Sequence, residues 1–188
     1  SISQYQLMIL DLMLPGISGE EIIKKTRYKE EIPIIVISAK TSLESKVNTL
    51  NIGADDYITK PFESEEIIAR VNSQLRRYRK YEKSTPSNKI HKFRKLILEE
   101  ETRTVKVKEQ EVYLTSHEFD ILSILIKNPD RVYSRETLYE QVWKNGYYGE
   151  DNSVNVHISN IRKKFKTVSP EEDYIKTVWG IGFKLNNN

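Results

Sequence analysis

The sequence contains no cysteine, and this absence excludes disulfide bonds and thiolate zinc sites. Its three histidines form no HExxH-type pair, so a zinc hydrolase of that kind is not indicated. No apolar run approaches the roughly 20 residues of a membrane span, and the first residues lack the pattern of a secretory signal peptide. We therefore expect a cytoplasmic protein with no membrane partner, although these absences do not demand that compartment.

Net charge is also small, and it is unevenly placed. Residues 1–82 carry 12 Lys+Arg and 12 Asp+Glu, so of the chain totals of 30 and 27 the remaining 18 and 15 lie in residues 83–188 and give the net charge of +3. The sequence changes style at the same point, which predicts two domains, 1–82 and 91–188, joined by a polar linker at 83–90. In the second domain the stretch 152–166 holds four bases and no acid. Such a local basic helix is typical of a nucleic-acid contact, but it also fits a solvated helix face.

The first domain alternates apolar strand patterns with helical ones. Its strands are short and apolar on both faces, as buried parallel strands are. Alternation of this kind predicts an α/β fold with a doubly wound parallel sheet. The expected elements are strands at 5–11, 33–38 and 56–60 and helices at 19–30, 42–52 and 64–81, the last with Ser64 as its N-cap.

Three of these strands end in residues that carry chemistry. Asp11 ends the first, Ser38 the second and Lys60 the third. In a parallel sheet, ligands bind at the carboxyl ends of the strands, so a carboxylate, a hydroxyl and an ammonium are expected around one pocket. A carboxylate placed there can accept a phosphoryl group. The alternative for Asp11 is a turn-forming acid before Leu-Pro-Gly.

The second domain reads as short strands over 91–114, three helices and a terminal hairpin. Strands are expected at Thr104–Val107 and Val112–Leu114, and helices at 116–127, 134–143 and 153–165. The segment from Tyr174 to Leu185 has two strand patterns around a Gly-bearing turn, which predicts a hairpin. This order is that of a winged helix-turn-helix, an α+β fold.

Five ordered stretches, spread over both domains, resemble two-component response regulators of the OmpR/PhoB type. The resemblance implies an incomplete flavodoxin-like receiver followed by a winged-helix domain that binds double-stranded promoter DNA. It also implies a sensor histidine kinase and RNA polymerase as partners, and no enzymatic activity of its own. The matching stretches are DLMLPG, GADDYITKPF, LTSHEFDIL, SVNVHISNIRKKF and TVWGIGF.

By this resemblance, Asp11 is the phosphoacceptor and takes its phosphoryl group from a phosphohistidine on the kinase. Lys60 and Ser38 would contact phosphoryl oxygens, and Tyr57 would turn inward when Ser38 moves, unless it is simply a packed strand aromatic. Asp11 and the backbone carbonyl of Met13 would be two ligands of a Mg²⁺ ion.

The chain departs from the family pattern ahead of Asp11, where no acid supplies the remaining Mg²⁺ ligands. We expect that the sequence begins inside a longer protein, with a piece somewhat longer than one ~30-residue β-α-β unit preceding it. The alternative is a phosphorylation-independent DNA-binding regulator with a vestigial receiver. An aspartate-dependent phosphohydrolase is disfavoured, because haloacid dehalogenases need a second acid where this chain has Met13.

The resemblance also implies a homodimer of the activated protein. Its interface would use the surface of the helix at 42–52, the strand at 56–60 and the helix at 64–81, with the alternative of a solvated charged surface. The implied intersubunit ion pairs are Lys46–Glu66, Asp56–Arg70 and Asp55–Arg77, around an apolar patch of Val47, Leu50 and Ile68.

The helix at 153–165 has an apolar core face, and its other side would enter the major groove of DNA. An Asn side chain can read adenine there, and a Val can touch a thymine methyl group. His157 either contacts phosphate or caps the core, and Trp179 lies at the tip of the wing. Residues 144–151 would form a loop that reaches RNA polymerase or is a plain surface loop. The expected DNA-binding residues are Asn152, Asn155, Val156, His157, Ser159, Asn160, Arg162, Lys163 and Trp179, with Lys164 and Lys166 as further phosphate contacts.

Overall fold

The computed structural model describes residues 5–28, 32–82, 89–143 and 152–187, with backbone alone for 76–82. It divides into two compact units, residues 1–82 and 83–188, and each is described by itself. Within the described ranges, no helix has the length and apolar character needed to cross a membrane. The predicted loop at 144–151 and most of the predicted linker, 83–88, lie outside the described residues.

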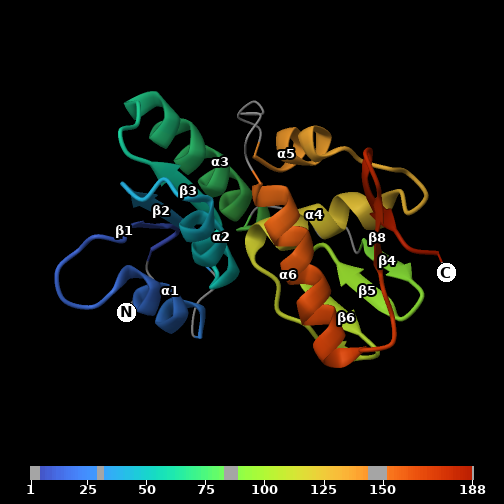
Figure 1. Ribbon diagram of the computed structural model, residues 1–188. Helices are drawn as coiled ribbons and strands as arrows, with labels where there is room; N and C mark the ends of the chain where they lie inside the picture. Colours follow the sequence, from blue (N-terminus) through green and yellow to red (C-terminus); the bar gives the residue numbers. More distant parts are fainter. Residues whose placement is uncertain (1–4, 29–31, 83–88, 144–151, 188) are drawn as a thin grey trace. The chain divides into compact units, whose positions relative to one another are not determined.

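The first unit is built on a three-stranded parallel sheet in the order β1-β2-β3. This confirms the predicted α/β arrangement of strands and helices (Figure 1). Its elements are β1 (Met8–Asp11), α1 (Gly19–Arg27), β2 (Ile34–Ser38), α2 (Leu43–Asn51), β3 (Asp56–Thr59) and α3 (Ser64–Glu82).

The middle strand β2 is buried along its whole length, because helices cover both faces of the sheet. Ile35, Ile37 and Ile58 form an apolar cluster on one face. Ile67 and Val71 of α3 pack against that cluster, while α1 lies on the other side of the sheet (Figure 1). Because helices cover the faces of the sheet, polar functional groups can reach solvent only at the ends of its strands.

The helix starts show how local capping sets the boundaries. The hydroxyl oxygen of Ser18 accepts a hydrogen bond from the amide of Glu21 at the start of α1, and Ser42 caps α2 in the same way. Ser64, predicted as an N-cap, is instead the first helical residue of α3, because the carbonyl oxygen of Glu63 already accepts a helical bond from Ile67. An N-cap is the residue whose carbonyl accepts the first such bond.

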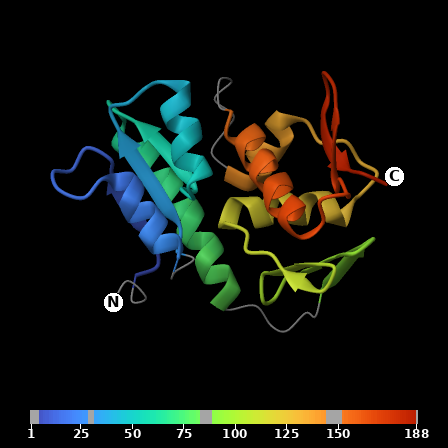
Figure 2. The same cartoon turned by 60° about the horizontal axis from the view of Figure 1, so that its bottom comes forward.

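The second unit contains a four-stranded antiparallel sheet, three helices and a two-stranded hairpin, which confirms the winged-helix prediction. Figure 2 shows the hairpin β8–β9 projecting from the helices of its unit. The elements are β4 (Ile90–Phe93), β5 (Leu96–Glu99), β6 (Thr104–Val107), β7 (Gln110–Glu111), α4 (Ser116–Lys127), α5 (Arg135–Trp143), α6 (Ser153–Val168), β8 (Ile175–Val178) and β9 (Gly182–Leu185).

The strand predicted at Val112–Leu114 was wrong. The pairs Lys106–Glu111 and Val107–Gln110 close β6 and β7 into a hairpin two residues earlier. Its loop is Lys108-Glu109, and both residues have positive φ, 50° and 64°. A two-residue loop of this kind matches the twist of the strands, so the chain turns before the β-branched residues are reached.

One apolar core joins the sheet, the helices and the hairpin of this unit. As predicted, the core face of α6 is buried, with Val154, Ile158, Ile161 and Phe165 at most 2% exposed. Tyr133 pairs with the β8–β9 hairpin as an isolated antiparallel bridge, in which its amide and its carbonyl both bond to Phe183. A Cβ atom on Gly182 would lie 2.0 Å from the carbonyl oxygen of Tyr133, so only glycine permits this approach.

Candidate functional site

Asp11 and Lys60 meet at the carboxyl ends of β1 and β3. The ammonium of Lys60 lies 2.5 Å from Oδ2 of Asp11, and the amide of Met13 donates to Oδ1 over 2.9 Å. The Lys60 hydrogen bond, followed by that of Met13, lowers the pKa of the Asp11 carboxyl. Both side chains remain partly exposed, at 29% and 41%. The site therefore presents an ionised, accessible carboxylate beside a fixed positive charge.

Ser38 and Tyr57 both form a hydrogen bond with the backbone of Lys40. The amide of Lys40 donates to the hydroxyl oxygen of Ser38 over 3.2 Å, and the Tyr57 hydroxyl donates to the carbonyl oxygen of Lys40 over 2.7 Å. Ser38 is fully buried and Tyr57 is 8% exposed. The aromatic ring is thus on the inside, and one backbone residue connects it to the serine. Sequence reasoning did not single out Lys40, since its contribution is made by backbone atoms.

The residues present do not by themselves fit a Mg²⁺ site. Mg²⁺ demands nearly octahedral oxygen coordination, and here the predicted ligands are one carboxylate, Asp11, and the carbonyl of Met13. In the described parts of the chain, no group of three His, Asp or Glu side chains is placed to hold a metal ion. The peptide bond between Lys60 and Pro61 is cis.

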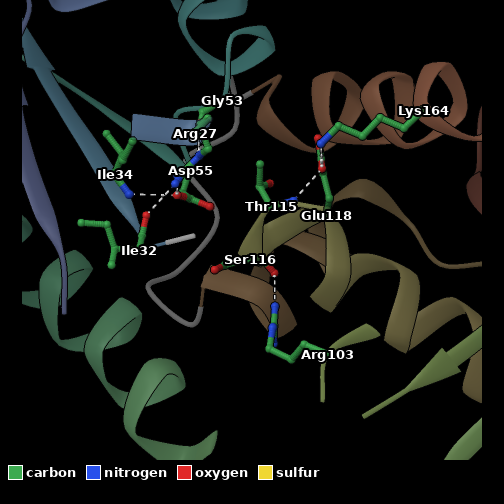
Figure 3. A network of polar contacts seen from close by, with 10 residues as sticks. All are labelled: Arg27, Ile32, Ile34, Gly53, Asp55, Arg103, Thr115, Ser116, Glu118 and Lys164. Carbon is green, nitrogen blue, oxygen red and sulfur yellow. Dashed lines mark hydrogen bonds and ion pairs between the residues drawn. The ribbon is translucent and has the colours of Figure 1, made fainter. Parts of the chain in front are cut away.

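Asp55 is an internal anchor rather than a surface charge. Its Oδ2 accepts hydrogen bonds from Arg27 over 2.5 Å and from the amide of Ile34 over 2.8 Å, and its side chain is fully buried (Figure 3). The same guanidinium donates to the carbonyl oxygens of Gly53 and Ile32. These bonds tie the end of α1 to β2 and to the turn before β3. The sequence predicted that Asp55 pairs with Arg77 across a dimer, whereas here it is buried against Arg27, which was missed because it lies 28 residues away.

Asp56, Arg70 and Glu66 form an ion-pair cluster within one chain. Arg70 contacts both carboxylate oxygens of Asp56, at 2.8 and 2.9 Å, and Oε1 of Glu66 at 2.9 Å. These residues were expected to pair across a dimer, and in this chain the acids already have an intramolecular partner. Leu50 is 3% exposed and Ile68 57%. Of the remaining predicted interface residues, Lys46 is half-buried, and the side chain of Arg77 lies outside the described residues.

In the second unit, Arg162 connects α6 to the wing. Its guanidinium donates to the carbonyl oxygen of Ile175, at 2.9 and 3.1 Å, and to the hydroxyl of Thr177 at 2.8 Å. Burial lowers the pKa of this guanidinium. The sequence predicted that Arg162 contacts phosphate, whereas in the structure its guanidinium bonds to the hairpin.

The two neighbouring lysines are engaged as well. Lys164 lies 2.6 Å from Oε2 of buried Glu118, which also accepts from the amide of Thr115 (Figure 3). Lys166 lies 2.8 Å from Asp173. Of the four basic residues between positions 152 and 166, Lys163 is the exposed one. Helical spacing places a lysine on a face, but it does not reveal a partner from a distant part of the sequence.

The open side of α6 is narrower than predicted. Val156 and Asn160 are each 7% exposed, so they are not on an open outer face. Asn152, Asn155 and Ser159 are half-buried, and the amide nitrogen of Asn155 donates to Oδ1 of Asn152 over 3.2 Å.

His157 is a core residue, as the second of its two interpretations had it. It is fully buried, as is His117, and their ring centroids are 5.5 Å apart. The ring of Trp143 stacks on His117 at 4.2 Å and on Tyr139 at 4.7 Å. This aromatic cluster joins α4, α5 and α6, so the imidazole of His157 positions α6 rather than contacting DNA. Trp179, by contrast, is 91% exposed at the hairpin tip.

Comparison with known proteins decides the family. Residues 2–72 match the response regulator receiver domain, and residues 109–185 match the C-terminal domain of transcriptional regulatory proteins. Regulatory protein VanR of Enterococcus faecium is 42% identical over 187 residues, which span 97% of this chain and 80% of VanR. The chain belongs to the OmpR/PhoB-type response regulators.

Other relatives agree with this assignment. The transcriptional regulatory protein ResD of Bacillus subtilis (strain 168) is 38% identical across 97% of this chain and 78% of ResD. A solved structure of a RitR mutant has a TM-score of 0.73 and 29% identity, covering 98% of this chain and 80% of that chain. This response regulator therefore has the family's receiver and winged-helix DNA-binding domains and functions in two-component transcription regulation.

Proposed function

We propose that this response regulator is switched by phosphorylation of Asp11, with residues 1–82 as receiver, 83–90 as linker and 91–188 as the DNA-binding domain. The observation that carries the proposal is the Asp11–Lys60 contact of 2.5 Å at the carboxyl ends of β1 and β3, with Ser38 at the end of the strand between them. A carboxylate, a lysine and a hydroxyl in this order suit the formation and detection of an acyl phosphate.

The chemical step is a phosphoryl transfer. An oxygen of Asp11 attacks phosphorus, the P–N bond of the kinase phosphohistidine breaks, and the departing imidazole keeps the electron pair and takes a proton. The lowered pKa of Asp11 keeps the nucleophile ionised. Lys60, now 2.5 Å from the carboxylate, then pairs with a phosphoryl oxygen as a point charge. The kinase phosphohistidine is the phosphoryl donor, and the protein acts as a regulator of transcription.

Receiver domains of this family generally bind Mg²⁺ at an acidic pocket. In this chain Asp11 and the carbonyl of Met13 would contribute to such a site, and the ion would neutralise phosphoryl charge. Because these two ligands are too few for Mg²⁺, the step above rests on Asp11, Lys60 and Ser38 alone.

Phosphorylation would be relayed to a dimer surface on α2, β3 and α3. Ser38 would leave the amide of Lys40 for a phosphoryl oxygen, and the Tyr57–Lys40 bond would move with that loop. The surface would use Lys46, Glu66 and Arg77 around exposed Ile68, because Leu50, Asp56 and Arg70 are buried within the chain. Each contact would occur twice in a symmetric dimer, and exposed ion pairs there contribute at most ~1 kcal/mol each.

The activated dimer would bind two half-sites of promoter DNA in the cytoplasm and act on RNA polymerase. The exposed side of α6, with Asn155, Ser159 and Lys163, would read the major groove. Joining two DNA-binding domains turns the second contact into an intramolecular one, which raises affinity without any new contact.

Intact mass spectrometry tests the phosphorylation. The protein is incubated with acetyl phosphate and Mg²⁺, beside the variant Asp11→Asn. We expect a gain of one phosphoryl group in the parent protein and no gain in the variant. Absence of any gain in the parent protein would favour a phosphorylation-independent DNA-binding regulator.

A further inference from the structure

Lys40 connects the phosphorylation site with the loop that leads into α2. Its backbone bonds to Ser38 on one side and to Tyr57 on the other. It stands two residues before Ser42, whose hydroxyl oxygen caps α2. The side chain of Lys40 has a partner of its own, because its ammonium lies 3.5 Å from Oε1 of Glu20 in the first turn of α1. The loop before α2 is therefore joined to α1 by an ion pair.

Both ends of this ion pair lie on loops that leave the edge of the sheet where Asp11 stands. Glu20 directly follows Gly19, the first residue of α1. A Cβ atom on Gly19 would lie 2.8 Å from Cα of Leu12 and 3.5 Å from the carbonyl oxygen of Asp11, so the start of α1 packs on the phosphoacceptor's own backbone. Lys40 comes two residues after the end of β2, which pairs with β1. The ion pair therefore bridges the segments that follow β1 and β2.

The charges around the phosphoacceptor are balanced in the unphosphorylated protein. Asp11 is paired with Lys60, and Glu20 is paired with Lys40, which gives two negative and two positive charges. A phosphoryl group carries about −1.5 to −2 charge at pH 7, so phosphorylation of Asp11 replaces one negative charge by nearly two. The added charge repels Glu20 and attracts Lys40. Their side chains are 28% and 50% exposed, so water can solvate each charge when the pair separates.

We propose that the Glu20–Lys40 ion pair is a latch that holds the loop before α2 in its resting position and opens when Asp11 is phosphorylated. Glu20 is a positioning residue, since it acts through Lys40 and takes no part in phosphoryl transfer. In the unphosphorylated protein, the latch keeps the Lys40 backbone beside Ser38 and Tyr57, so the dimer surface stays in its inactive form. The latch depends on the proposed phosphorylation switch at Asp11.

The latch has a size that dimerisation can report. A partly exposed ion pair shifts an equilibrium by about two- to fivefold. A symmetric dimer contains two latches, so this factor enters the association constant twice. Loss of the pair is therefore expected to raise the association constant of the unphosphorylated protein about four- to 25-fold. The association constant of the phosphorylated protein should not change, because its latches are already open.

Analytical ultracentrifugation of the full chain, with and without acetyl phosphate and Mg²⁺, measures both association constants. The test variant is Glu20→Gln, which keeps the shape of the side chain and removes its charge. Its matched control is Glu21→Gln, which removes the same charge from the same end of α1. Glu21 is exposed and takes part in none of the ion pairs of the described residues. We expect the control to keep the parent values.

Two further measurements separate the latch from a general effect on the fold. The double variant Glu20→Lys/Lys40→Glu reverses the ion pair, and it should return the unphosphorylated protein to the association constant of the parent protein. Urea unfolding of the receiver should give equal free energies for Glu20→Gln and Glu21→Gln. A lower free energy for Glu20→Gln, with weaker dimerisation in both phosphorylation states, would show a merely structural role and overturn the latch.

Equal association constants for unphosphorylated Glu20→Gln and Glu21→Gln would also overturn it. The same holds for a rise in Glu20→Gln that the reversed pair does not cancel, because the contact with Lys40 would then not be its cause. A parent protein that takes up no phosphoryl group, or dimerises no better with one, would instead refute the proposed switch and the latch with it. The first two results appear in the variants and the last in the parent protein, so the two failures are distinguishable.

Discussion

The hydroxyl of Tyr57 donates a 2.7 Å hydrogen bond to the carbonyl of Lys40, whose own amide donates to the hydroxyl of Ser38. One backbone residue thus connects a strand-end serine near Asp11 with an aromatic ring on β3. A ligand that draws the Ser38 hydroxyl away would disturb this chain of two bonds. The ring can therefore report on the state of the carboxylate without touching it.

Replacing Tyr57 with Phe should uncouple signal from response. The variant lacks the donor to Lys40 but keeps the ring that packs on the sheet. We expect phosphoryl uptake from acetyl phosphate to stay at the level of the parent protein, while the phosphorylation-dependent gain in dimerisation falls severalfold. Mass spectrometry and analytical ultracentrifugation measure the two effects. A proportional loss of both would show that Tyr57 acts at the phosphorylation step instead.

Asp55→Asn should destabilise the receiver. The change leaves the Arg27 guanidinium without its negatively charged partner. Breaking a buried ion pair lowers the free energy of unfolding by about 3 kcal/mol. Urea unfolding of the receiver transition measures this loss, with exposed Glu63→Gln as the control that should change little. If Asp55→Asn weakened the dimer and left unfolding unchanged, the internal role of Asp55 would be refuted.

Arg162 and Lys163 should differ although they are neighbours on α6. Arg162→Met removes the bonds to Ile175 and Thr177, so we expect a stability loss of about 1–3 kcal/mol together with weaker DNA binding. Lys163→Ala should leave stability unchanged and lower the salt slope of binding by about 1. Thermal unfolding of each variant measures the stability. The salt dependence of Kd is measured with a DNA duplex that the parent protein selects from a random-sequence pool. Identical behaviour of the two variants would contradict the different roles of Arg162 and Lys163.

Tyr174 should make the DNA-binding domain sensitive to alkali. Burial, followed by the neighbouring Glu172 carboxylate, raises the pKa of Tyr174 to about 12, whereas an unfolded tyrosine titrates near 10. The protonated ring therefore contributes its full stability below about pH 10, and this contribution is lost as the pH rises toward 12. The whole difference is on the order of 2–3 kcal/mol.

Unfolding free energies between pH 9 and about 12 should fall less steeply for Tyr174→Phe than for the parent protein. Exposed Tyr113→Phe is the control and should follow the parent protein. A Tyr174→Phe curve parallel to that of the parent protein would show that this hydroxyl titrates normally.

The sequence predicted the fold well where local signals are strong. The bounds of α4, Ser116–Lys127, are as predicted from its apolar face, and at its start the Glu118 carboxylate accepts a hydrogen bond from the amide of Thr115. The hairpin at Lys108-Glu109 was missed because two-residue loops with positive φ usually carry Asn or Gly. Nothing in the Lys-Glu pair indicates such a turn.

The site was predicted in part. The rule that ligands bind at the carboxyl ends of parallel strands predicted one pocket for Asp11 and Lys60. The two side chains are in contact, although 49 residues separate them in the sequence. The same logic could not foresee that Arg27 takes Asp55 or that Arg162 turns to the wing. A long side chain such as that of arginine can bond to residues that only the tertiary fold brings near. Helical periodicity predicts the face on which the side chain lies, but not these distant partners.

The central claim is that phosphorylation of Asp11 switches DNA binding. Its most direct test is the affinity for a duplex that the parent protein selects from a random-sequence pool, measured before and after acetyl phosphate treatment in the parent protein and in Asp11→Asn. We predict that phosphorylation lowers Kd about tenfold or more in the parent protein and has no effect in the variant. Equal Kd values for the treated and untreated parent protein, once its phosphorylation has been verified by mass, would contradict a phosphorylation switch at Asp11.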